Sequence, residues 1–234
     1  MSVMDSKLWL KTRNGEYEVL LLDAAYEGNL KLVKKSVRKG ANVDCRDEGF
    51  YAPLHNAASE GHTETVEYLV KHGAPMEAKN KFGGTPLIMA ADHGRTKMVI
   101  LLVRKGADIG AADLEGNTSL HHAALRGYTD IAKFLLESGA SNEAKSKIGM
   151  IPLHNAAWNG HLDMAKLLIE NGGNKEVKDN EDRTPLHIAA WNGHVDMVKY
   201  LVTIGANKEA KTDKEETPLD LALKREKQDV VKFL

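Results

Sequence analysis

The chain has 234 residues, of which 42% are hydrophobic and 28% charged, and no apolar run approaches the roughly 20 residues that span a membrane. Its 32 Lys and Arg residues nearly balance its 33 Asp and Glu residues, so we expect neither nucleic acid nor a membrane as a partner. Cys45 is the only cysteine, which excludes an intrachain disulfide bond and a cysteine-based zinc cluster. The N-terminus lacks the apolar core of a secretory signal, so an intracellular location, in the cytoplasm, the nucleus or both, is expected.

A period of 33 residues runs through the chain from its first helical segment onward. One leucine marks every period: Leu21, Leu54, Leu87, Leu120, Leu153, Leu186 and Leu219. A glycine follows it in six of them: Gly28, Gly61, Gly94, Gly127, Gly160 and Gly193. Self-similarity of this length is typical of repeat proteins, in which each unit buries its apolar surface against the next.

Each repeat predicts two short helices and a loop. In one copy, Thr184 can cap a helix with its hydroxyl, and Pro185 suits the first turn because no N–H is needed there. Gly193 can then close this helix in the left-handed conformation before a second helix follows. The predicted domain covers residues 15–234 behind an N-terminal extension at residues 1–14. Its repeats are predicted at about 15–46, 47–79, 80–112, 113–145, 146–178, 179–211 and 212–234.

The segments TPLIMAADHG, IPLHNAAWNGH and TPLHIAAWNGH resemble the ankyrin-repeat signature T-P-L-H-x-A. The resemblance covers nearly the whole chain. It implies an all-α solenoid of stacked helix-turn-helix units with β-hairpin-like loops, and a concave face that binds proteins. The first and last copies depart from the signature and are predicted to be caps, since one face of each meets water. For the last copy the alternative is that the chain is a fragment of a longer protein.

Ten histidines raise the question of metal binding or catalysis. Seven of them recur with the period: His55, His121, His154 and His187 within the TPLH-like motif, and His62, His161 and His194 after the first glycine. For the first group the resemblance implies structural hydrogen bonds to the neighbouring turn. His72, His93 and His122 break the period and are interpreted as surface residues. Because no HExxH motif, cysteine pair or phosphate-binding glycine loop is present, we expect no metal, no cofactor and no enzyme activity.

Function is sought where the copies differ and face outward. The resemblance implies that the loop tips and the ends of the first helices line the concave face. The residues predicted to contact a partner there are Tyr51, Phe82, His93, Leu114, Leu125, Arg126, Ile148, Met150, Trp158, Asn159, Arg183, Trp191 and Asn192. Among them Leu125, Trp158 and Trp191 occupy one position in adjacent repeats, so they are predicted to form an apolar strip.

The two tryptophans stand in copies of the motif WNGH, and three interpretations apply to them. They can bind a partner, which is favoured because tryptophan is enriched among binding hot spots. They can instead pack on their own loop tips and cover the helix ends. The repeated motif can also reflect the duplication of one unit.

A basic row precedes the loops: Arg46, Lys79, Lys145, Lys178 and Lys211. An acidic row stands two positions earlier in each copy: Asp44, Glu77, Glu143, Glu176 and Glu209. Since side chains two apart on an extended segment share a side, we expect a solvated ladder of local charge pairs.

The favoured function is a non-catalytic adaptor, monomeric by itself, that binds another protein through the concave face. One alternative is a regulatory assembly chaperone similar to gankyrin, an all-ankyrin protein of comparable length and repeat number. An enzyme or a nucleic-acid binder is the alternative of another class, which the missing motifs and the balanced charge disfavour.

Overall fold

A computed structural model describes residues 15–234, and the predicted N-terminal extension at residues 1–14 lies outside them. Within the described residues the predicted fold class is confirmed: fourteen helices, α2 to α15, follow one another, and no β-strand lies among them. These residues form two compact units, one that ends at Leu114 and one that begins at Glu115. The helices of each unit alternate in sequence between a first and a second member of a pair.

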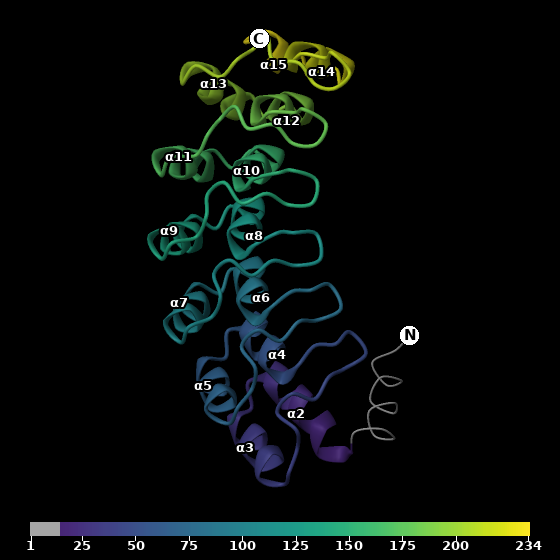
Figure 1. Cartoon of the computed structure of the whole chain (residues 1–234), viewed down its shortest axis with the longest axis vertical. Helices are drawn as coiled ribbons and strands as arrows, with labels where there is room; N and C mark the ends of the chain where they lie inside the picture. Colours follow the sequence, from purple (N-terminus) through teal and green to yellow (C-terminus); the bar gives the residue numbers. More distant parts are fainter. Residues whose placement is uncertain (1–14) are drawn as a thin grey trace. The chain divides into compact units, whose positions relative to one another are not determined.

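The first unit contains three helix pairs (Figure 1). Its first helices are α2 (Glu16–Glu27), α4 (Pro53–Glu60) and α6 (Pro86–Asp92). Its second helices are α3 (Leu30–Arg38), α5 (Thr63–Lys71) and α7 (Thr96–Arg104). Within this unit α2 packs on α4 and α4 on α6, while α3, α5 and α7 form a second row, so the repeats stack side by side.

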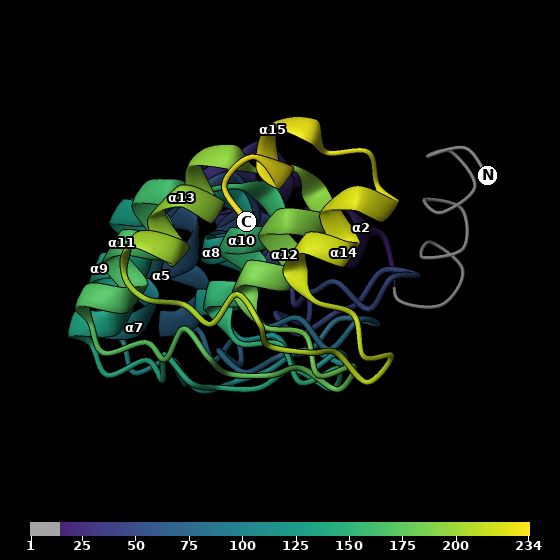
Figure 2. The same cartoon turned by 90° about the horizontal axis from the view of Figure 1, so that it is seen from above.

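The second unit contains four helix pairs. Its first helices are α8 (Ser119–Arg126), α10 (Pro152–Asn159), α12 (Pro185–Asn192) and α14 (Pro218–Lys224). Its second helices are α9 (Thr129–Glu137), α11 (Leu162–Glu170), α13 (Val195–Thr203) and α15 (Gln228–Val231). Figure 2 shows α9, α11 and α13 as one row beside α8, α10 and α12, with the loops running along the same side of both rows.

The first helices begin and end as the sequence predicts. At the start of α6 the Thr85 hydroxyl accepts a hydrogen bond from the Ile88 N–H at 3.3 Å, and Pro86 occupies the first turn. At the end of α10 the backbone of Gly160 has φ +70°, and its N–H bonds back to the Ala156 carbonyl. This left-handed residue closes the helix and redirects the chain into α11.

Small and large apolar residues divide the core between them. The Ala-Ala pair of α10, Ala156 and Ala157, is 0% exposed, so neighbouring first helices approach closely there. The repeat leucine beside the pair, Leu153, is also 0% exposed. From the second row α11 contributes Leu168, which is equally buried. Each repeat therefore buries its apolar face only against its own pair and its neighbours.

The loops between repeats are tight hairpin-like turns joined to one another by backbone hydrogen bonds. In the second unit the Asp179 N–H bonds to the Arg183 carbonyl across one turn at 3.0 Å. The Asn180 N–H bonds to the Ile148 carbonyl of the preceding turn, also at 3.0 Å. In the first unit the Lys81 N–H bonds to the Gly49 carbonyl at 2.9 Å in the same way. The loop tips of each unit are therefore held at a fixed spacing.

Candidate protein-binding surface

The strip predicted from the sequence lies within the second unit, at the ends of α8, α10 and α12. Trp158 is 41% exposed, a large fraction for a tryptophan. Leu125 and Trp191 are half-buried. The guanidinium of Arg225 lies over the Trp191 ring at 4.5 Å from its centroid, a cation–π contact that covers part of the ring. The structure thus gives Trp158 an open face and Trp191 a partly covered one.

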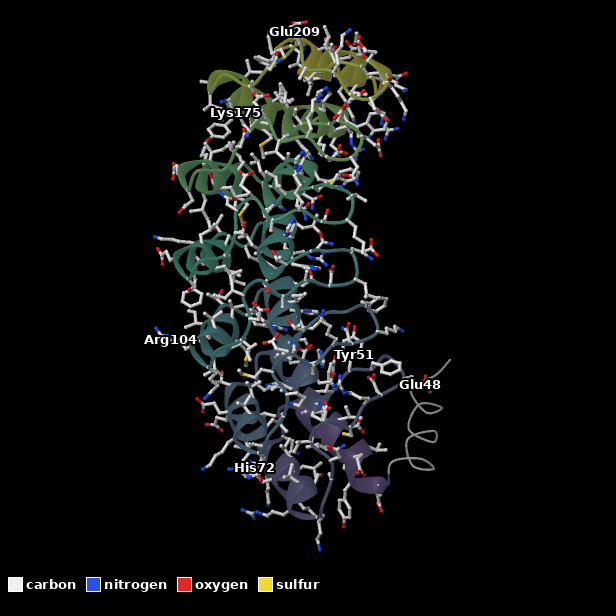
Figure 3. The ribbon with its side chains drawn as sticks, viewed as in Figure 1. Glu48, Tyr51, His72, Arg104, Lys175 and Glu209 are labelled. Carbon is white, nitrogen blue, oxygen red and sulfur yellow. The ribbon has the colours of Figure 1, made fainter. Side chains whose placement is uncertain are left out.

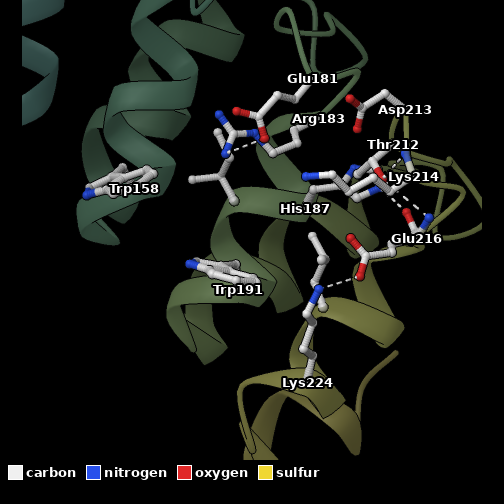
Figure 4. A pocket seen from close by; sticks show the side chains of 12 residues that line it. Trp158, Glu181, Arg183, His187, Trp191, Thr212, Asp213, Lys214, Glu216 and Lys224 are labelled. Atoms are coloured by element: carbon white, nitrogen blue, oxygen red, sulfur yellow. Dashed lines mark hydrogen bonds and ion pairs between the residues drawn. The ribbon is translucent and has the colours of Figure 1, made fainter.

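Both tryptophans line a pocket of about 150 Å³ (Figure 4). Ile188 and Leu221 add apolar walls, and the charged side chains around them are Glu181, Arg183, Asp213, Lys214, Glu216 and Lys224. Several of these charges already have partners: Lys224 and Glu216 form an ion pair at 2.8 Å. A pocket with apolar walls and a charged rim of both signs suits an apolar side chain of a partner flanked by polar groups.

Arg183, one of the predicted contact residues, is anchored within its own loop. Its guanidinium forms an ion pair at 2.7 Å with Asp179, whose side chain is 0% exposed. Glu181 lies 3.4 Å from another nitrogen of the same group. Asp179 also accepts the backbone N–H of Arg183 at 2.9 Å. The arginine therefore shapes the turn, and its side chain, which is 24% exposed, also lines the pocket.

Two predicted contact residues in the loop beside the strip differ in exposure. Ile148 is 53% exposed at the tip. Met150 is 7% exposed, because its N–H bonds to the Ser146 hydroxyl and its carbonyl to the His121 ring, which draw the chain inward. Met150 consequently offers no open surface to a partner.

The asparagines that follow the tryptophans cap helix ends. The Asn159 amide donates to the Leu125 carbonyl at 2.6 Å, and the Asn192 amide donates to the Ile188 carbonyl at 3.1 Å. Arg126, the remaining predicted residue of this unit, is exposed. The two amides stabilise the helix ends from which the side chains of the strip project. Contact of Asn159 and Asn192 with a partner stays a prediction.

The other predicted residues lie in the first unit. Phe82 and Leu114 are 58% and 54% exposed at loop tips. Tyr51 is half-buried with its ring edge-on to His55, and His93 is exposed at the end of α6. Tyr51 and His93 line a broad groove, of about 770 Å³, whose carboxylates are Asp23, Glu27, Asp47, Glu48, Glu60 and Asp92. No motif in the sequence indicates this groove, since its carboxylates are scattered over three repeats.

Histidines of the TPLH-like motif link consecutive repeats, as the resemblance implied. In His154, Nδ1 accepts the Ile151 N–H at 3.2 Å, and Nε2 donates to the Arg183 carbonyl of the next repeat at 3.0 Å. His55 is bonded in the same manner to Ala52 and Gly84. Each ring is 0% exposed and must be neutral to serve as acceptor and donor at once. Their structural role is confirmed.

The second histidine row also joins repeats. Nε2 of His194 donates to the Trp158 carbonyl at 2.8 Å, and Nε2 of His161 donates to the Leu125 carbonyl at 3.1 Å. In the first unit Nε2 of His62 bonds to the Tyr26 carbonyl at 2.9 Å, and in the third repeat Arg95 stands in place of the histidine and donates to the Ser59 carbonyl at 2.7 Å. These bonds involve the main chain of the strip residues, so shortening a strip side chain leaves them in place.

We expect acid to destabilise the fold through the buried rings. Burial lowers the pKa of His154 to about 4 from its usual 6.5, and the pKa of His55 similarly. The unfolded chain binds the proton more tightly than the folded chain does. The free energy of unfolding is therefore highest above about pH 6.5 and falls as the pH drops toward about 4. The slope is at most about 1.4 kcal/mol per pH unit for each ring. Urea midpoints measured between these pH values report the slope.

Two substitutions assign that slope to the buried rings. His154→Gln should flatten the pH dependence, whereas His72→Gln, at an exposed ring, should leave it unchanged. An equal effect of both substitutions would contradict the assignment.

The charged rows before the loops follow the expectation only in part. Asp44 and Arg46 form the expected local pair. The expectation is wrong for Glu77 and Lys79, because both reach forward to the next repeat: Glu77 accepts the Asp108 N–H at 2.9 Å, and Lys79 donates to the Ala112 carbonyl at 3.2 Å. Glu143 accepts an N–H of the following repeat likewise. These rows are part of the stacking contacts.

No group of three or more His, Cys, Asp or Glu side chains in residues 15–234 is placed to hold a metal ion. Burial raises the pKa of the Cys45 thiol to about 12, so this side chain is protonated at neutral pH. No helix in the part of the chain that the structure describes is long and apolar enough to span a membrane.

Comparison with known proteins agrees with the repeat architecture. The family model described as ankyrin repeats (3 copies) matches residues 21–113, 73–147, 105–179 and 153–234. No curated protein matches the chain. Ankyrin repeats are generally protein–protein interaction modules and typically non-catalytic. With matched residues from 21 to 234 and helix pairs that repeat throughout, the chain belongs to the ankyrin-repeat family.

Proposed function

We propose that the chain is a non-catalytic adaptor that binds a partner protein through the surface formed by Leu125, Trp158 and Trp191. The observation that carries the proposal is the open face of Trp158, 41% exposed beside a pocket that Trp191 also lines. A large aromatic side chain at the mouth of a pocket is typical of a binding hot spot. A partner fits best if it inserts an apolar side chain and presents both charges to the rim.

The three interpretations of the tryptophans can be weighed against this geometry. Duplication explains why the motif recurs, but it does not require an open aromatic ring. Packing within the chain explains much of the burial of Trp191, because the guanidinium of Arg225 partly covers its ring. It accounts less well for Trp158, for which a partner provides the missing cover.

The test is capture of partner proteins by the immobilised chain with and without its tryptophans. We expect Trp158→Ala combined with Trp191→Ala to remove the specifically retained proteins, since tryptophan anchors contribute about 2 kcal/mol or more each. Phe233→Ala is the matched control, because Phe233 is an aromatic residue with 42% exposure outside the strip. Retention of the same proteins by the double variant would refute the proposed surface.

A melting measurement on the same variants separates binding from folding. The His194 bond to the Trp158 carbonyl uses the main chain, so the double variant should keep its helical circular dichroism. A fall in melting temperature of many degrees would instead assign the tryptophans to the core.

We also propose a domain extent, an oligomeric state and a cellular location for the chain. They are one ankyrin domain over residues 15–234 with the seven repeats given above, a monomeric state in isolation, and a location in the cytoplasm or nucleus. Sedimentation addresses the second, and imaging of the tagged full chain addresses the third.

A further inference from the structure

Helix α3 has an unusual concentration of positive charge. The segment from Leu30 to Lys39, the residue that follows the helix, contains no acidic side chain. Its basic residues are Lys31, Lys34, Lys35, Arg38 and Lys39. Their spacing of three and four residues places them along one stripe of the helix. Four of the five are exposed, and Lys34 is half-exposed. The opposite face packs inward through Val33, which is 0% exposed.

The stripe has no ionic partner among the residues that the structure describes. Lys34 lies over the Tyr68 ring at 5.7 Å, and this contact is with a neutral group. Second helices in the other unit differ: Lys166 pairs with Asp163 on α11, and Lys199 with Asp196 on α13. Packing therefore does not explain why five cations gather on α3, since uncompensated like charges on neighbouring turns destabilise a helix.

The surroundings limit what the stripe can bind. In the next repeat the positions equivalent to Lys31 and Lys34 are Glu64 and Glu67, both exposed on α5. Packed helices lie about 8–10 Å apart, so any flat or long polyanion that covers both helices would meet these carboxylates. A lipid surface and a nucleic-acid duplex are therefore disfavoured.

The length of the stripe gives the size of its ligand. Eight residue steps along a helix correspond to about 12 Å. An extended polypeptide covers that distance with about four residues at 3.3 Å each. A short run of Asp or Glu side chains consequently matches the stripe in length and in charge, without extending over α5.

We infer that the cationic stripe of α3 is a second docking surface, which binds a short acidic segment of a partner protein. This surface lies in the first unit, on a second helix, whereas the tryptophan strip lies on first helices of the second unit. Figure 3 shows that, in the first unit, His72 and Arg104 at the ends of second helices lie on the side away from Glu48 and Tyr51 of the loops. The stripe thus remains accessible whatever occupies the loop face of its own unit.

The experiment measures fluorescence anisotropy of a labelled peptide that carries a run of about four Asp/Glu residues between Gly and Ser residues, titrated with the full chain at low salt. We expect saturable binding that a peptide with Asn and Gln in place of the acids does not show. Lys31→Gln, Lys34→Gln, Lys35→Gln and Arg38→Gln together should weaken it by about tenfold or more.

The matched control removes the same number of charges from the same unit. It combines Lys71→Gln, Lys97→Gln, Arg104→Gln and Lys105→Gln, all at exposed positions in second helices or, for Lys105, directly after one. Its affinity should fall by less than about threefold, because only the general field changes. An equal loss in both variants would overturn the inference, as would absence of saturable peptide binding to the unaltered chain.

Two further measurements keep the outcome independent of folding and of partner class. A nitroxide-labelled acidic peptide should broaden amide signals of residues 30–39 in the unaltered chain, and broadening elsewhere would refute the site. Phosphatidylserine vesicles and an RNA oligonucleotide are tested in parallel, and tighter stripe-dependent binding of either would show that the partner is not an acidic polypeptide. The Trp158→Ala, Trp191→Ala variant should bind the peptide normally, so failure of one surface does not imply failure of the other.

Discussion

Replacing Gly160 by alanine is expected to lower the free energy of unfolding by about 3 kcal/mol. About 1–2 kcal/mol of this is the penalty for a side chain in the left-handed conformation. The rest follows from displacement of the His194 ring and loss of its hydrogen bond. Gly160 has φ +70°, and a Cβ there would lie 2.6 Å from Nδ1 of His194. That ring must move, and its Nε2 then loses the bond to the Trp158 carbonyl. The measurement is urea unfolding followed by far-UV circular dichroism.

Gly172→Ala is the control that isolates the steric part. Gly172 also has a positive φ, +86°, but nothing lies within 4 Å of the position of its Cβ. Its cost should be limited to the backbone term, about 1–2 kcal/mol. If the two substitutions cost the same, the contact between Gly160 and His194 contributes nothing to the stacking of repeats.

Leu153→Ala is expected to cost about 3 kcal/mol, within the range for leucines that leave a cavity in a core. Leu153 is 0% exposed and lies on α10, between α8 and α12, so little of its surroundings can collapse into the space. Urea unfolding again gives the value.

Leu223→Ala serves as the comparison for the cavity. Leu223 is 51% exposed on α14, so the same substitution there should change the free energy of unfolding by less than about 1 kcal/mol. A similar loss at both leucines would mean that Leu153 is not a core position and that the assignment of repeats is wrong.

The period of the sequence predicts the fold almost completely, because one set of residues solves one packing problem in every copy. Thr85 caps α6 and Gly160 ends α10 as expected. The local motif determines these features, and no long-range contact is needed to anticipate them. Repetition also distinguishes structural histidines from catalytic ones, since a catalytic site has no reason to recur in every unit.

The candidate surface is less predictable, because exposure depends on which atoms of neighbouring repeats happen to lie above a side chain. Nothing local indicates that Met150 is buried or that Arg225 lies over Trp191. The forward bonds of Glu77 and Lys79 were also missed, because a charge pair two residues apart and a bond to the next repeat have the same sequence pattern. Only the stacking geometry separates these alternatives.

The histidine links also give the second unit a direction. His154 and His187 each donate to the repeat that follows, but the next position is Asp220, whose carboxylate accepts only from Thr217 of its own helix start. The repeat that contains α14 and α15 therefore accepts a hydrogen bond from the His187 ring but has no histidine at the equivalent position to donate one in turn. Its amides should exchange with solvent deuterium sooner than those of α10 and α12, so that loss of structure in this unit begins by fraying at that pair.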